Sequence, residues 1–161
     1  MPFTIFISHG PDDIDVVRFI ASQLQLGGQR PLIAHEDRPP KAARSLPKRI
    51  RERILESGCV LALISNQGSQ SDLVRQEVEF ASDKRPIIPI LRGSVSAPRL
   101  DFLRGAQIIR FSGRALNPSL EGLISWTPQI SVKGRQTEAL RQIAFLTLGA
   151  LMTWRLSGQR G

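Results

Sequence analysis

The sequence has little cysteine, little histidine and no tyrosine: one Cys, two His and no Tyr among 161 residues. Cys59 alone cannot form an internal disulfide, and so few nitrogen and sulfur ligands cannot build a closed metal site without several carboxylates. The first residues also lack the charged-then-apolar run of a secretory signal. We therefore expect a cytoplasmic protein from a reducing compartment, with no metal centre.

Lysine is scarce as well, since it supplies only four of the 22 basic residues behind the net charge of +8. An arginine excess favours carboxylates, phosphates and planar rings as partners. The stretch from Arg38 to Arg53 holds seven cations against one acid, Glu52. Because no aromatic side chains alternate with these cations, nucleic acid is an unlikely partner, and a nucleotide phosphate or an acidic protein surface fits better.

Apolar segments of strand and helix length alternate along the chain, which indicates one domain followed by a tail. We expect helices that begin at the caps Asp12 and Ser45, a helix in residues 71–82, and a last one that begins at Asn117 and Pro118. Expected strands cover residues 3–8, 30–35, 59–65, 85–91 and 106–111, and Pro89 argues against full pairing of the fourth. The pattern predicts an α/β, flavodoxin-like open parallel sheet of five strands, order 2-1-3-4-5, with helices on both faces. Residues 1–128 form this domain, and 129–161 form a linker and an apolar C-terminal helix.

In this strand order the winding reverses between the first and third strands, where ligands favour the crevice at the carboxyl ends. Its expected walls are residues 8–10 and 65–71. The helix that follows carries an acid in an unusual place, because Leu73, Glu77 and Ala81 are four apart on its apolar stripe. Glu79 lies on the polar side. The Glu77 carboxylate is therefore expected to face inward, beside the crevice.

Four segments, "IFISHGPDD", "CVLALIS", "SQSDLVRQEVEFA" and "RPIIPIL", resemble the Toll/interleukin receptor (TIR) domain in its prokaryotic, NAD-cleaving form. The resemblance covers residues 3–126. Its most specific element is the pattern Ser-x-Trp-(Cys or Val)-x-x-Glu, here Ser71, Leu73, Val74 and Glu77. The resemblance implies that Glu77 is catalytic in cleaving the nicotinamide–ribose bond of NAD+, which is a substrate and not a cofactor. The candidate substrate-binding residues are Ser8, His9, Gly10, Asp37, Arg38, Ser71 and Leu73.

The function implied is an NAD+ glycohydrolase in antiphage or other immune-like defence, activated by self-assembly of TIR protomers, with ADP-ribose or a cyclic variant as product. The chain departs from the pattern at Leu73, where the family usually has tryptophan, and at Pro39 and Pro40, where it usually has Pro-Gly. The alternative is a non-catalytic adaptor that acts only through TIR–TIR contacts.

Each assignment has a structural alternative. Glu77 can be neutralised by an arginine, His9 can be a turn residue bonded to backbone, and His35 can simply end a strand. The tail is uncharged from Gln142 to Trp154 and too short to span a bilayer. It can pack on its own domain or on a partner's tail, contact a membrane through residues 139–156, or stay disordered.

Overall fold

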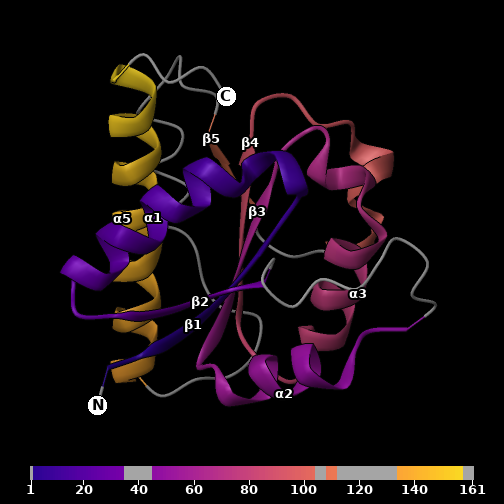
Figure 1. The fold of residues 1–161 in the computed structure, drawn as a ribbon, viewed down its shortest axis with the longest axis horizontal. Helices are drawn as coiled ribbons and strands as arrows, with labels where there is room; N and C mark the ends of the chain where they lie inside the picture. The colour runs from indigo at the N-terminus through magenta and orange to yellow at the C-terminus, as the bar shows by residue number, and fades with distance from the viewer. Residues whose placement is uncertain (1, 35–44, 104–107, 112–133, 158–161) are drawn as a thin grey trace.

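The computed structural model describes residues 2–34, 45–103, 108–111 and 134–157 (Figure 1). Its strands are β1 (Thr4–His9), β2 (Arg30–Ile33), β3 (Cys59–Ile64), β4 (Ile87–Arg92) and β5 (Ile109–Phe111). Its α-helices are α1 (Ile14–Leu26), α2 (Lys48–Glu56), α3 (Asp72–Ala81) and α5 (Gly134–Leu156). The described residues also form three short 3-10 helices, η1 (Pro11–Asp13), η3 (Gly68–Gln70) and η4 (Ala97–Leu103). The helix expected from Asn117 lies outside the described residues.

The five strands form one parallel sheet in the order β2-β1-β3-β4-β5, which confirms the predicted architecture. β3 is buried along its whole length, as its uninterrupted apolar sequence indicated. Pro89 stands opposite Ala62 of β3, while pairing with β5 begins one residue later, at Ile90. The proline therefore lies outside the β4–β5 pairing, where its missing N–H costs nothing.

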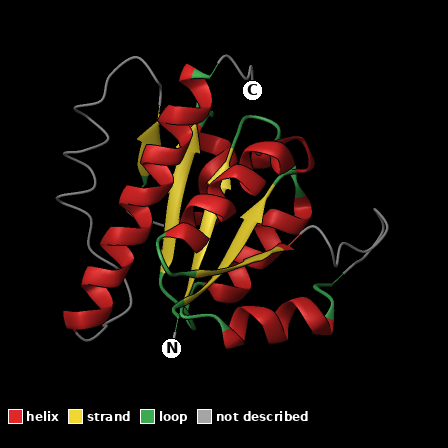
Figure 2. Cartoon of the chain, turned by 60° about the vertical axis from the view of Figure 1, so that its left-hand side comes forward, coloured by secondary structure: helices red, strands yellow, loops and turns green. Residues whose placement is uncertain are grey.

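Helices cover both faces of the sheet, with α1 and α5 on one side and α2 and α3 on the other (Figures 1 and 2). Successive residues of β1 point to opposite faces of the sheet, so neighbouring side chains pack against different helix layers. Ile5 and Ile7 join the core cluster beneath α1 and α5, whereas Phe6 joins the cluster beneath α2. The two faces of the sheet therefore hold separate cores.

Two helix starts differ from expectation. The residue at the amino end of α1 is Asp13 rather than Asp12, and its side chain makes no capping bond. Pro47 holds the corresponding position in α2, so Ser45 is not the cap. Ser71 does cap α3, because its hydroxyl accepts a hydrogen bond from the Val74 N–H at 3.3 Å. The Gly27–Gly28 pair ends α1, with Gly28 at a φ of +82°.

The C-terminal helix α5 packs along α1 on its own domain, one of the expected outcomes. The Phe19 and Trp154 rings are in contact, with centroids 5.5 Å apart and planes tilted by 45°. Near the other end of the contact, the backbone of Gly27 lies against Leu146. No helix in the described part of the chain has the length and apolarity to cross a membrane.

Candidate functional site

Glu77 is fully buried, with 0% of its surface exposed. α3 begins at the Ser71 cap, which places Glu77 about one and a half turns into the helix. Its neighbours on the helix enter two different cores: Val74 and Val78 pack toward β3 and β4, whereas Leu73 and Ala81 pack toward α2. The carboxylate therefore projects toward the sheet, at the boundary between the two cores, as the sequence predicted.

Ser8 of β1 meets this carboxylate directly, since its hydroxyl donates a hydrogen bond to Oε2 of Glu77. Ser8 follows Phe6 by two residues, so both point to the face that α2 and α3 cover. Ser8 is itself fully buried. The structure thus brings together one predicted substrate-binding residue and the predicted catalytic residue, near the carboxyl end of β1.

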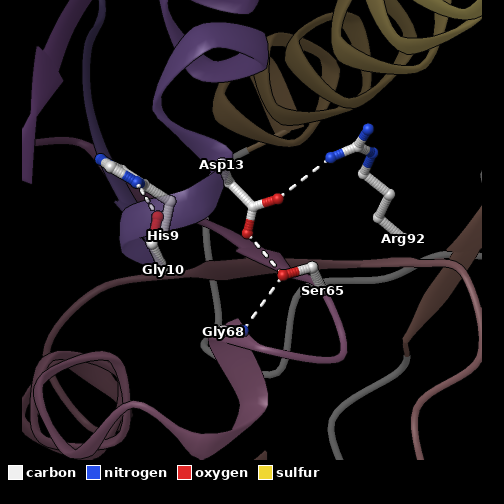
Figure 3. Close-up of polar contacts among 6 residues, drawn as sticks. All are labelled: His9, Gly10, Asp13, Ser65, Gly68 and Arg92. Carbon is white, nitrogen blue, oxygen red and sulfur yellow. Dashed lines mark hydrogen bonds and ion pairs between the residues drawn. The ribbon is translucent and has the colours of Figure 1, made fainter. Parts of the chain in front are cut away.

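His9 is not part of this pair, because the residue after Ser8 points to the opposite face of the sheet. It is fully buried, and its Nδ1 lies 2.7 Å from the carbonyl oxygen of Gly10, so this nitrogen carries the proton that it donates (Figure 3). The backbone-bonded alternative for His9 is therefore present in the structure.

Asp13 forms a second polar cluster, which the sequence reasoning missed (Figure 3). Its Oδ2 accepts a hydrogen bond of 2.6 Å from the Ser65 hydroxyl, and its Oδ1 accepts one of 3.0 Å from Arg92. The Ser65 oxygen in turn accepts the Gly68 N–H at 3.1 Å. Burial raises the pKa of the Asp13 carboxyl above its ordinary value, outweighing the opposite effects of Ser65 and Arg92. This cluster ties the starts of α1 and η3 to the end of β4.

A signal for this cluster was present in the strand pattern. Ser65 and Arg92 each follow, by two residues, an apolar residue that points toward α1, namely Leu63 and Ile90. Alternation therefore sends both polar side chains to the α1 face at the carboxyl edge of the sheet. An acid at the amino end of α1 is the natural partner for them. The sequence analysis named only the neighbouring Asp12, as the expected cap of this helix.

The two expected walls of the crevice touch each other at Gly10 and Gly68. A Cβ placed on Gly10 would lie 2.7 Å from the Cα of Gly68, too close for any side chain. The crevice that the sequence predicted between residues 8–10 and 65–71 is therefore closed at this point, because two glycines let the backbones meet. A ligand must bind beside this contact rather than between the two segments.

The other predicted site residues have varied positions. Ser71 is half-buried and acts as the α3 cap, and Leu73 is half-buried against the core beneath α2. Asp37 and Arg38 lie outside the described residues. A cavity of about 250 Å³ lies near the opposite edge of the sheet, lined in part by Phe3, Gly58 and Arg85. It has no residue in common with the predicted site.

The sequence matches the TIR-domain family over residues 5–124, which include Ser8, Glu77 and Asp13. The chain belongs to the TIR-domain family. The match ends before α5 begins. Together with the strand order, the match confirms the family that the motifs indicated.

Similar solved structures include the TIR domains of the activated Roq1 resistosome, which directly recognizes the pathogen effector XopQ. The identity is 13% and the TM-score 0.49, with 91% of this chain and 84% of that chain covered. A putative quinone reductase from Klebsiella pneumoniae has 10% identity and a TM-score of 0.43, with 94% and 85% covered. At such values neither similarity indicates a function. No curated protein matches the chain significantly.

Proposed function

We propose that this TIR domain is an NAD+ glycohydrolase in which Glu77 is the catalytic carboxylate. The observation that carries the proposal is the position of Glu77 at the glutamate of the TIR motif, turned inward and bonded to Ser8. The resemblance to NAD-cleaving TIR domains supplies the substrate. It also supplies the biological setting, antiphage or immune-like defence, in which NAD+ is consumed or converted to an ADP-ribose-type signal.

A single carboxylate suffices for this reaction. Most glycosidases need two acids because the leaving alkoxide must be protonated. The nicotinamide of NAD+ is cationic and departs neutral, so a general acid is unnecessary. The ribose develops positive charge as the bond breaks, and a carboxylate held nearby stabilises that charge, more strongly in a site from which water is excluded. Ser8 holds one oxygen of Glu77 in place for this role.

The burial of Glu77 also constrains how the enzyme is activated. With 0% of its surface exposed, the carboxylate cannot meet a dinucleotide in the conformation described here. Substrate binding must therefore be coupled to a rearrangement around α3 that exposes Oε1 or Oε2. Self-assembly of TIR protomers, as the family resemblance implies, is the event that we propose to drive it.

The proposal is tested by incubating the concentrated full-length protein with NAD+ and following nicotinamide release by chromatography, which also separates ADP-ribose from a cyclic product. Glu77→Gln keeps the size of the side chain and removes its charge. Glu79→Gln is the matched control, because Glu79 is an exposed acid on the same helix. We expect release by the wild type and by Glu79→Gln, and a loss of about 100-fold or more in Glu77→Gln. Equal rates in all three proteins would exclude Glu77 from the mechanism.

Two observations favour the alternative function, a non-catalytic adaptor: the burial of the Glu77 carboxylate and the presence of Leu73 at the usual tryptophan position. An adaptor has no need of an accessible carboxylate, and Leu73 provides no aromatic surface for a nucleotide ring. It predicts a wild type that assembles without releasing nicotinamide. Assembly and nicotinamide release measured on the same samples therefore separate the two functions.

A further inference from the structure

We propose that the cavity at the amino edge of the sheet binds a small carboxylate with an apolar body, such as an aromatic acid. The residues that carry this inference are Phe3, Gly58, Lys84, Arg85, Gln136 and Leu140, all of which line the cavity. The cavity lies at the edge opposite to Ser8 and Glu77. The inference is therefore independent of the proposed enzyme activity.

Separate segments of the chain meet at this cavity. Phe3 comes directly before β1, Gly58 directly before β3 and Pro86 directly before β4, so all three lie where parallel strands begin. Gln136 belongs to the first turn of α5, whose amino end lies near the N-terminus of the chain (Figure 1). The end of the Phe3 ring packs against the Gly58 backbone, since a Cβ built on Gly58 would lie 2.4 Å from the ring. Glycine at position 58 thus lets the phenyl ring form one wall.

The positive charge at the cavity is only partly balanced. The residues that line it include two cations, Lys84 and Arg85, and no carboxylate. Asp83 offsets the first, because its Oδ1 lies 2.6 Å from the Lys84 ammonium. No acid in the described part of the chain forms an ion pair with Arg85. One unbalanced positive charge favours a monoanion as the ligand.

The Arg85 guanidinium has donors left for such a ligand. It donates to two neutral backbone carbonyls, that of Lys84 at 2.8 Å and that of Leu55. A guanidinium carries five N–H groups, so most of its donors remain, and Nε has no partner among the described residues. Arg85 is half-buried, which strengthens its attraction for an anion relative to a fully solvated charge. A planar carboxylate matches the planar fork of donors.

The apolar walls and the volume limit the body of the ligand. Phe3, Pro86 and Leu140 supply apolar surface, so a hydrocarbon group gains from leaving water there. The volume of about 250 Å³ lies below the roughly 300–1,000 Å³ typical of pockets for drug-sized ligands. A single ring with a carboxyl group fits this space, whereas a dinucleotide is too large. Inorganic phosphate would leave the apolar walls uncovered.

The first test is titration of the full-length protein with benzoate, followed through the backbone amide signals of Gly58, Arg85 and Leu140 in NMR spectra. Benzamide is the neutral probe of the same shape, and inorganic phosphate is an anion without the apolar body. We expect saturable shifts with benzoate and a dissociation constant about tenfold lower than for either other probe, since each of them lacks one of the two contacts. Benzoate shifts that fail to saturate, or equally tight binding of benzamide or phosphate, would overturn the proposal.

The second test changes the charge at the cavity without changing its size. Gln136→Glu places a negative charge on an exposed lining residue, so benzoate should bind about fivefold more weakly or worse. The matched control is Gln142→Glu, an exposed glutamine further along α5 that does not line the cavity, which should bind benzoate as the wild type does. Gln136→Glu binding as tightly as the wild type would overturn the proposal.

Arg85→Gln tests the cation itself. This variant should lose the preference for benzoate over benzamide, and circular dichroism checks that it keeps its helix content. A folded Arg85→Gln protein that retains the preference would show that Arg85 does not recognise the carboxylate. If the variant fails to fold, Gln136→Glu still decides the question, because Gln136 is exposed.

Discussion

Two buried carboxylates lie at the same edge of the sheet but on opposite faces, and they differ in their surroundings. Asp13, on the α1 face, accepts bonds from a hydroxyl and from the Arg92 guanidinium. Glu77, on the α3 face, accepts a bond from the neutral Ser8 hydroxyl. Asp13 is held against a cation and joins three segments of the chain, which indicates a structural role. We propose that Glu77, which accepts the Ser8 hydroxyl, stabilises a cationic transition state instead. The comparison therefore predicts that Asp13 serves stability and Glu77 serves chemistry.

The largest stability effect is expected at the Asp13–Arg92 pair. The side chains are 3% and 19% exposed, so Arg92→Met leaves a buried carboxylate without its cation and should lower the free energy of unfolding by about 3 kcal/mol. The control is Asp101→Asn, which breaks the exposed Arg75–Asp101 pair at 2.8 Å and should cost less than about 1 kcal/mol. Urea unfolding measures both. Similar losses in the two variants would contradict the structural role of Asp13.

A somewhat smaller effect is expected where the two loops meet. Gly10→Ala brings a methyl group to 2.7 Å from the Cα of Gly68, so the backbones must separate. We expect a loss of about 2 kcal/mol in the free energy of unfolding. Gly149→Ala, in open space on α5, should instead be neutral or slightly stabilising when measured at low protein concentration. An unaffected Gly10→Ala protein would show that the loops do not meet as described.

The two carboxylates also show how far the sequence was informative. The strand order, the layers and the inward direction of Glu77 were all predicted, because they follow from apolar periodicity. The bond between Ser8 and Glu77 was not predicted. It joins residues 69 positions apart, and only the register of β1 against the helices brings them together.

The Asp13–Ser65–Arg92 cluster and the Gly10–Gly68 contact were missed for a related reason. Each depends on how loops that follow different strands are placed against one another beyond the edge of the sheet. No local sequence pattern determines that placement. The sequence correctly predicted that strand ends would converge at this edge. It did not predict that two glycines would close the crevice between β1 and β3.

For the catalytic side of the comparison, Ser8→Ala removes the hydroxyl that holds Glu77. Nicotinamide release should fall about tenfold, which corresponds to the loss of one hydrogen bond to a charged group. Ser57→Ala is the matched control, since Ser57 is also a buried serine, bonded to the Ile54 carbonyl near the opposite edge of the sheet. Unchanged release in Ser8→Ala would mean that Ser8 does not position Glu77.

The smallest effect concerns pH. Burial raises the pKa of folded Asp13 above 3.8, so the folded protein holds this proton more tightly than the unfolded chain. The contribution of Asp13 to stability is therefore greatest below pH 3.8 and falls as pH rises through the raised pKa. Relative to Asp13→Asn, wild-type stability should therefore decline over this window. Urea unfolding of both proteins between pH 3 and pH 6, about the range in which free carboxyls titrate, measures this decline. If the stability of the wild type relative to Asp13→Asn rose with pH instead, the prediction would be wrong.

The most direct test of the division between the two acids compares Glu77→Gln and Asp13→Asn in one experiment, with nicotinamide release normalised to the amount of folded protein. We predict that Glu77→Gln stays as stable as the wild type and loses release about 100-fold or more, while Asp13→Asn changes stability and keeps release within a few-fold of the wild type. A Glu77→Gln protein that releases nicotinamide at the wild-type rate would contradict the account.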